Sequence, residues 1–296
     1  MRPNFTWRLR SRTLALGQRT LVMGVVNVTP DSFSDGGLYV SAERAIEHAL
    51  RLVGEGADIL DIGGESTRPG AGVGTTAAVS AQQESDRILP VIEGVRRARP
   101  DAIVSVDTYK ARVARAAVVA GAEIVNDVSA GLWDAAMPHT LAQLGCGAVL
   151  MHTRGRPDEW RKLPPVADMV ALVKRDLADR ARAALDAGIA RERIVLDPGF
   201  GFGKNFEENY PLLARFADLR ELGYPLLAGT SRKSFIGRAL ARDGKDLPAS
   251  ERLYGSLAAA TMTMLAGAHI VRAHDVAATV QAARVVEAAL SPGLSS

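Results

Sequence analysis

The chain has 296 residues, of which 47% are hydrophobic and 23% charged, a composition typical of a globular protein. A net charge of +3, from 36 basic and 33 acidic residues, does not indicate a nucleic-acid-binding protein, although a few placed cations could still bind an anion. The single cysteine, Cys146, excludes an intrachain disulfide and a cysteine-rich zinc site, and no run of 18 apolar residues predicts a membrane span.

The first segment, FTWRLRSRTLALG at residues 5–17, alternates apolar and polar residues on both sides of Ser11 and Arg12, which predicts a short hairpin. The first 20 residues carry five arginines and no acid, a pattern that an organelle transit peptide would also show. They lack the hydrophobic core of a signal peptide, and we expect a cytoplasmic protein.

Apolar runs then recur along the chain, each followed by a polar break and a helical pattern. They cover residues 20–28, 57–64, 102–108, 123–129, 147–153, 193–199, 225–231 and 268–275. Continuous apolar runs indicate parallel strands that are covered on both faces. Eight such strands alternating with helices predict an α/β protein with a (β/α)8 TIM barrel, or, less favoured, a doubly wound open sheet.

The segments between the runs have helical periodicity. Residues 41–57 have Ser41 as a candidate N-cap and Gly54 and Gly56 at the end, and residues 79–98 open with the capping-box spacing of Ser80 and Gln83. Residues 165–188 and 275–290 show the same period. No linker interrupts the alternation, so we predict one domain over residues 1–296, with the hairpin (1–19) at the barrel floor and a flexible tail (291–296).

Polar side chains stand at the carboxyl end of every one of the eight runs. They are Asn27; Asp61 and Glu65; Asp107; Asn126 and Asp127; His152; Asp197; Ser231, Arg232 and Lys233; and Arg272, His274 and Asp275. Because the carboxyl ends of parallel strands meet at one rim, where ligands bind in such folds, the set predicts a binding site.

Two of the loops at this rim have distinctive sequences. In VVNVTPDSFSDGG (25–37), Asn27 ends the strand and Phe33 is a candidate cover for a substrate, although this segment taken alone favours a surface loop with a partly buried Phe. In DIGGESTRPGA (61–71), Thr67 offers a hydroxyl and Arg68 a bidentate contact to phosphate; the alternative is a glycine-rich turn with a solvated arginine.

A third loop, LDPGFGFGKN (196–205), is not a nucleotide-binding motif. Its glycines alternate, which breaks the GxGxxG spacing; Gly199 to Lys204 is one residue short of the Walker A spacing, and no Ser or Thr follows the lysine. Asp197 is the informative residue, because it is an anion that ends an apolar strand.

Near the C-terminus, GTSRKSFIG (229–237) places Lys233 and Ser234 at a helix start, which suits an anion or, alternatively, a serine N-cap with solvated cations. Arg272 and His274 lie on the same side of a strand and are candidates to face pyrophosphate. The histidines are not spaced as metal-ligand pairs, so we expect no transition-metal site; Mg²⁺ held by one amide or carboxylate and by substrate phosphates is allowed.

With the motifs NVTPDSFSDGG, DIGGESTRPGA, SVDT, ND, DPGFGFGK, SRKSFIG and RAHD in this order, the chain resembles bacterial dihydropteroate synthases along nearly its whole length. The resemblance implies a (β/α)8 barrel, usually a homodimer. It also implies an enzyme that joins para-aminobenzoate to 6-hydroxymethyl-7,8-dihydropterin diphosphate, releasing pyrophosphate and dihydropteroate, a folate precursor. Two places depart from the usual pattern: Ala273, where valine is common, and the basic segment MHTRGRPDEWRKLP (151–164).

The resemblance also implies roles for individual residues. Pterin and other substrate contacts would be Asp107, Asn126, Met151, Asp197, Phe202 and Lys233. The diphosphate would meet Thr67, Arg68, Arg272 and His274, with Asn27 as the ligand of a Mg²⁺ cofactor. Para-aminobenzoate would meet Phe33, Arg68, Lys233 and Ser234. The implied mechanism is dissociative, and Asp31 or Asp35 would support a cationic methylene that the arylamine attacks.

Two other functions remain open at this point. A methyltetrahydrofolate:corrinoid methyltransferase would share the acceptors Asp107, Asn126 and Asp197, but it has no need of Arg68, Lys233 and Arg272 around a leaving diphosphate. A catalytically silent pterin-binding paralogue would be expected to have lost one of these motifs, and none is lost here.

Overall fold

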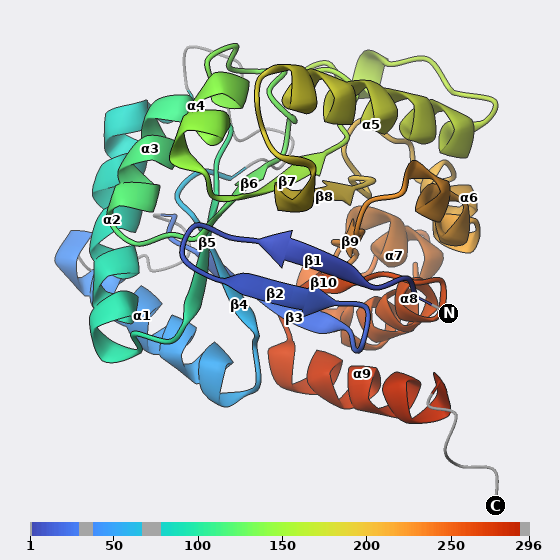
Figure 1. The fold of residues 1–296 in the computed structure, drawn as a ribbon. Coiled ribbons are helices and arrows are strands. Elements are labelled where there is room, and N and C mark those ends of the chain that lie inside the picture. The colour runs from blue at the N-terminus through green and yellow to red at the C-terminus, as the bar shows by residue number, and fades with distance from the viewer. Residues whose placement is uncertain (1, 30–37, 67–77, 291–296) are drawn as a thin grey trace, which may run out of the picture.

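A computed structural model describes residues 2–29, 38–66 and 78–290, and Figure 1 shows it as a barrel of strands surrounded by helices. The predicted tail and the residues Asp31, Phe33, Asp35, Thr67 and Arg68 lie outside the described residues. In the described part of the chain, no helix is long and apolar enough to cross a membrane.

Eight parallel strands form the barrel in the order β8-β7-β6-β5-β4-β3-β10-β9. Their bounds are β3 Leu21–Asn27, β4 Ile59–Gly63, β5 Ile103–Asp107, β6 Ile124–Asp127, β7 Gly147–Met151, β8 Ile194–Asp197, β9 Leu227–Ala228 and β10 Ile270–Ala273. A parallel bridge between Leu196 and Leu226 joins the two outer strands. All eight predicted strands are confirmed, and the joined ends decide for the barrel against the open sheet.

Helices cover the outside of the barrel (Figure 1). They are α1 Leu38–Gly54, α2 Ala81–Ala98, α3 Ala111–Val119, α4 Met137–Leu144, α5 Met169–Asp186, α6 Asn209–Ala214, α7 Ser234–Ala239, α8 Leu253–Leu265 and α9 Val276–Leu290. Short 3-10 helices are η2 Trp160–Lys162, η3 Arg191–Arg193, η4 Phe216–Leu222 and η5 Ala249–Glu251. The main core lies between the helices and the outer faces of the strands, where apolar side chains such as Leu52, Ile88 and Val173 are fully buried.

The two predicted helix starts had different outcomes. Ser80 is the N-cap of α2: its hydroxyl accepts from Gln83 N, and the Gln83 side chain accepts from Ser80 N at 3.0 Å. The prediction that Ser41 caps the first helix is wrong, because α1 begins at Leu38 and Ser41 lies inside it. Arg44 lies three residues after Ser41 and cannot accept a hydrogen bond from a backbone N–H as Gln83 does, so no capping box forms there. Serine is also tolerated inside helices.

The N-terminal hairpin, β1 Phe5–Arg8 and β2 Thr13–Leu16, lies across one end of the barrel (Figure 1). Trp7, Leu9 and Leu16 belong to a buried cluster with inward side chains of the barrel strands, such as Met23 and Ile124. The indole nitrogen of Trp7 donates to the carbonyl of Arg193 at 2.9 Å. The hairpin therefore closes the barrel floor, as predicted, and leaves the opposite rim for ligands.

Candidate active site

Four polar side chains meet inside the barrel near its carboxyl rim. Arg272 on β10 donates from Nε to Asp61 on β4 at 2.6 Å and from Nη2 to Asp107 on β5 at 2.7 Å. Asn126 on β6 donates to the same oxygen of Asp61 at 2.9 Å. Asp107 and Asn126 are partners in the register of neighbouring strands, which places them side by side at the rim. The sequence-predicted Asp107, Asn126 and Arg272 are thus brought together.

Asp61 stands at the centre of this cluster. It is 0% exposed, and its Oδ1 atom has no hydrogen-bond partner among the described residues. A buried polar atom left unpaired costs about 1–3 kcal/mol, so such an acceptor indicates a donor that a ligand would supply.

Burial controls the charges in this cluster. It raises the pKa of Asp107 to about 7; Arg272 opposes this shift, and the nearby Asp61 and Glu84 add to it. The carboxylates of Asp61 and Asp107 hold the pKa of Arg272 above its usual value despite its burial, so the guanidinium is charged. The cluster therefore combines a fixed cation with acceptors that a buried ligand can use.

Asp197, at the end of β8, is another buried carboxyl at the rim. Its Oδ1 accepts from Gly199 N at 2.7 Å. Burial raises the pKa of Asp197 to about 6, against the Gly199 N–H and the cations of Lys233, Lys204 and Arg272.

Lys233 belongs to this part of the rim. It is the N-cap residue of α7, so Ser234 is the first helical residue and the serine N-cap alternative is wrong. Its ammonium lies 4.2 Å from the centroid of the Phe202 ring. Lys233 and Phe202, both predicted to bind substrate, are therefore in contact, and Ser234 is exposed beside them.

Apolar side chains form one wall of the site. Met151, Tyr109 and Val128 make a small buried cluster against which Trp133 and Phe202 pack. Trp160 adds an edge-to-face contact with Phe202, the ring centroids lying 5.3 Å apart. Met151 ends β7, so the wall stands at the same rim as the polar cluster. A wall of rings beside polar groups suits a flat heteroaromatic ligand.

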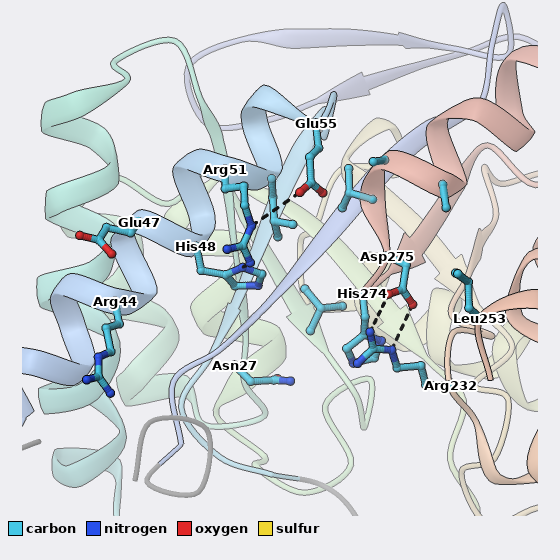
Figure 2. Close-up of a pocket in the computed structure, with 15 residues that line it drawn as sticks. Asn27, Arg44, Glu47, His48, Arg51, Glu55, Arg232, Leu253, His274 and Asp275 are labelled. Atoms are coloured by element: carbon cyan, nitrogen blue, oxygen red, sulfur yellow. Dashed lines mark hydrogen bonds and ion pairs between the residues drawn. The ribbon is translucent and has the colours of Figure 1, made fainter. Parts of the chain in front are cut away.

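A cavity of about 800 Å³ opens among the described residues next to Asn27 and His274. Figure 2 shows His274 and Arg232 on one side of it, His48 and Arg51 of α1 on the other, and Asn27 at its edge. His274 Nδ1 lies 3.0 Å from Ser231 Oγ. Burial, reinforced by Arg272, Arg232 and Lys233, lowers the pKa of His274 to about 3. His274 is therefore neutral near pH 7 and can act as a hydrogen-bonding group.

Arg272 and His274 do not share one set of partners. The Arg272 guanidinium binds Asp61 and Asp107, whereas His274 lines the cavity with Asn27. The sequence pattern placed both on one side of a strand, but it does not specify which neighbours each side chain contacts.

Four other rim residues hold loops in place. Glu65 pairs with Lys110 at 2.6 Å, Asp127 accepts from Ser129 and Gly131, Asp275 pairs with Arg232 at 2.6 Å, and His152 contacts Lys204 at 2.9 Å. Cys146 is buried as expected, and burial raises the pKa of its thiol to about 11, so it is not a reactive thiolate.

Sequence reasoning named Asp61 among the residues of the predicted rim but assigned it no contact with a ligand. The signal was present, because Asp61 interrupts the buried run ILDIG, and an anion at a strand end was the reason for choosing Asp197. A single sequence does not tell a buried carboxyl with an open acceptor from one that is fully paired.

The described residues contain no group of three or more His, Cys, Asp or Glu side chains that could hold a metal ion. The Asn27 amide oxygen, at the cavity edge, is the ligand type that Mg²⁺ accepts when substrate phosphates and water complete its shell. Asn27 therefore fits a magnesium ion that is bound mainly through its substrate.

Comparisons with known proteins agree with this chemistry. A family model described as "Pterin binding enzyme" matches residues 23–274. The dihydropteroate synthase of Escherichia coli K12 is 46% identical over 270 residues, which cover 91% of this chain and 92% of that protein.

Solved structures give the same result. The Xanthomonas albilineans dihydropteroate synthase with 4-aminobenzoic acid superimposes with a TM-score of 0.87 at 46% identity, covering 98% of this chain and 99% of that one. The complex of the X. albilineans enzyme with 7,8-dihydropteroate gives a TM-score of 0.83 at 43% identity, with 97% and 99% covered.

Proposed function

The chain belongs to the pterin-binding enzymes, and within them to the dihydropteroate synthases, and from that membership we propose how its residues perform the reaction. It is a transferase of folate synthesis that condenses 6-hydroxymethyl-7,8-dihydropterin diphosphate with para-aminobenzoate. The observation that carries the proposal is the cluster of the buried Asp61 and Asn126 with the half-buried Asp107 and Arg272, with one acceptor unpaired, next to a wall of aromatic rings.

The polar cluster and Asp197 would bind the pterin. The amino-pyrimidine edge of a pterin presents several N–H donors, and the acceptors here are Asp61 Oδ1, Asp107, Asn126 and Asp197. Met151 and Phe202 would contact the ring from the apolar wall, and Lys233 would reach it from beside Phe202. Removing an acceptor would leave a buried donor of the ligand unpaired, which makes the site selective.

The diphosphate would lie toward His274 and Asn27, with Thr67, Arg68 and Arg272 completing the site. The neutral imidazole of His274 has one N–H group, which would donate a hydrogen bond to the diphosphate. Ser231 Oγ is the polar neighbour of its Nδ1 atom. Asn27 would hold a magnesium ion that, when bound, neutralises charge on the departing diphosphate. This places the leaving group beside the cavity at the barrel edge.

The reaction would then proceed by substitution at the methylene carbon. The carbon–oxygen bond to the diphosphate breaks, and the electron pair leaves with the diphosphate. The electron-rich pterin stabilises the cationic methylene, and Asp31 or Asp35 supports that charge. The arylamine forms the carbon–nitrogen bond and loses one proton. Phe33, Arg68, Lys233 and Ser234 would hold the para-aminobenzoate.

The two other functions that the sequence left open fit less well. The methyltransferase has no leaving diphosphate and would not need Lys233 or Arg272 at the rim. A silent paralogue would keep the pterin site and lose turnover, so activity decides that case.

The whole chain would act as one pterin-binding domain in the cytoplasm, and as a homodimer. A row of exposed apolar side chains on α8 is suited to contact a second copy: Tyr254 is 83% exposed, Met262 46% and Leu265 56%. Light scattering on the purified protein should give twice the chain mass, and Met262→Asp should give the single-chain mass. Val119→Asp, on the exposed end of α3, should leave the mass unchanged; a parent protein of single-chain mass would contradict the dimer.

Calorimetric titration with 6-hydroxymethylpterin tests the pterin site. Asp197→Asn should weaken binding about 10- to 100-fold, since an unpaired buried donor costs about 1–3 kcal/mol. Asp186→Asn, an exposed carboxyl on α5, is the matched control and should bind as the parent does. Equal affinities for the two variants would overturn the assignment of Asp197.

A further inference from the structure

The loop after β8 carries two of the proposed substrate contacts, and its backbone is unusually constrained. Gly199, Gly201 and Gly203 all have positive φ, at 66°, 80° and 64°. A Cβ atom on Gly199 would lie 2.0 Å from the carbonyl oxygen of His152, and one on Gly203 would lie 2.5 Å from that of Arg154. The loop therefore packs directly against the backbone that follows β7, and Gly199 and Gly203 make this contact possible.

The alternating glycines also separate the two phenylalanines of the loop. Phe200 is 1% exposed and stacks with Phe216 and Phe235 in the core. Phe202 lies at the rim, beside Lys233. The position of this loop thus sets where Phe202 and Asp197 stand.

Lys204 lies in the middle of this loop and is buried, although none of the proposed chemical steps uses it. Its ammonium donates to the carbonyls of Gly199 at 2.7 Å and Phe202 at 3.2 Å, and it lies 2.9 Å from His152 Nδ1. An ammonium has three N–H donors, and these three acceptors use all of them. Lys204 therefore ties both ends of the Gly199–Phe202 turn to His152, the residue after β7.

The contact of Lys204 with His152 requires one tautomer of the imidazole. Nδ1 can accept only if the proton sits on Nε2, and Nε2 lies 3.3 Å from Asp176 Oδ2 on α5. Burial and the Lys204 cation lower the pKa of His152 to about 4, so the ring is neutral. Asp176 accepts from the ring and so keeps Nδ1 free to accept from Lys204.

We propose that Asp176, His152 and Lys204 form a hydrogen-bonded relay that positions the β8–α6 loop, and with it Asp197 and Phe202, for pterin binding. In this relay, Lys204 is a positioning residue, and Asp176 on α5 fixes the tautomer of His152 that Lys204 requires. The inference rests on the proposed roles of Asp197 and Phe202.

Loss of the Lys204 proton would release this loop. A neutral amine has two N–H donors for three acceptors, so one of the loop contacts is lost. Burial lowers the pKa of Lys204 to about 7, with Lys233 and Arg154 acting in the same direction and Asp197 and Glu208 against it. Arg175, which pairs with Asp176 at 3.0 Å, is the further charge at the outer end of the relay.

Asp176→Asn is the test variant. An asparagine amide can donate a hydrogen bond to His152 Nε2. The ring proton then sits on Nδ1, where it faces the Lys204 ammonium. The alkaline limb of kcat/KM for the pterin diphosphate should then move to lower pH by about one unit, the usual size of such shifts in folded proteins. Asp179→Asn removes an exposed carboxyl on the same helix, 3.9 Å from Arg182, and should leave the profile unchanged.

A profile of Asp176→Asn that coincides with the parent profile would overturn the relay while leaving the proposed function intact. Lys204→Met should lower kcat/KM roughly 100-fold, the effect expected of a misplaced contact. If this variant does not fold, the Asp176→Asn profile still decides.

Nitrogen-15 NMR of the histidine rings tests the relay independently of turnover, with His152→Gln used to assign the signal. The parent should show His152 protonated at Nε2, and Asp176→Asn should shift the proton toward Nδ1. A parent ring protonated at Nδ1 would overturn the inference even in an active enzyme.

Discussion

Arg272 shows how this site is prepared at the scale of single residues. One guanidinium contacts two carboxyl groups, Asp61 at 2.6 Å and Asp107 at 2.7 Å, on two strands that are far from Arg272 in the sequence. The geometry fixes the carboxylates around the space a ligand would enter, so little reorganisation is needed when it binds. The cost is a set of buried charges that the ligand must help to satisfy.

Binding of the pterin should depend on pH through Asp197, because its carboxylate is the acceptor. The pKa of Asp197 is raised to about 6, so the acceptor form is present above that pH and is lost as the pH falls through it. Affinity for 6-hydroxymethylpterin, measured by calorimetry from pH 7 to 4.5, should therefore begin to fall as Asp107 takes up a proton near pH 7 and should fall further as Asp197 does so near pH 6, toward about tenfold per pH unit for each group. An affinity that stays constant below pH 6 would contradict this role.

Most of the described site residues could be predicted from the sequence, but their partners could not. Asp107, Asn126 and Asp197 follow apolar strands, and strand order alone brings them to one rim. The pairing of Arg272 with Asp61 depends on which side chains fill the barrel interior, and these come from β10 and β4, which are not neighbours in the sheet. Burial of Asp61 was likewise a three-dimensional property.

At the scale of elements, the β8–α6 loop shows why a glycine pattern was hard to interpret. Sequence spacing argued against the nucleotide-binding motifs, but it gave no reason for three alternating glycines. The reason is the close approach to the β7 loop and three backbone positions with positive φ. The start of α1 was predicted wrongly for a related reason, because a capping residue is defined by its hydrogen bonds and not by its residue type. Ser80 makes these hydrogen bonds with Gln83.

Substitution of Gly199 by alanine should destabilise the enzyme and weaken pterin binding. The new Cβ would lie 2.0 Å from His152 O, and a left-handed backbone costs a non-glycine residue about 1–2 kcal/mol before any clash. Thermal unfolding and calorimetry would measure the two effects.

Gly54→Ala is the control for this substitution. It adds a methyl group at the end of α1, where nothing lies within 4 Å, and should leave both quantities near the parent values. Equal melting temperatures for the two variants would contradict the packing of the loop.

At the scale of the whole molecule, the two ends of the barrel have separate tasks. The hairpin fills the floor with Trp7, Leu9 and Leu16, and the rim carries the polar cluster. Substitutions in the floor should therefore change the free energy of unfolding, and substitutions at the rim should change ligand binding.

Trp7→Ala tests this separation. Truncating a fully buried tryptophan costs about 3–5 kcal/mol of unfolding free energy, and here a hydrogen bond of 2.9 Å to Arg193 O is lost as well. Chemical denaturation should show that loss, whereas the folded variant should keep the parent affinity for 6-hydroxymethylpterin. The neighbouring exposed Thr6, changed to alanine, should alter neither property. Weakened pterin binding in folded Trp7→Ala would show that the two ends are coupled.

The most direct test of the account is pyrophosphate release from dihydropterin diphosphate with Mg²⁺, measured with and without para-aminobenzoate. We expect release that requires the arylamine, forms dihydropteroate in equal amount, and falls at least about 100-fold in Lys233→Ala, the loss expected when a positioned charged contact is removed. The exposed Lys245→Ala should match the parent. Pterin binding without release would indicate a silent paralogue, and release unaffected by Lys233→Ala would contradict the site described for this chain.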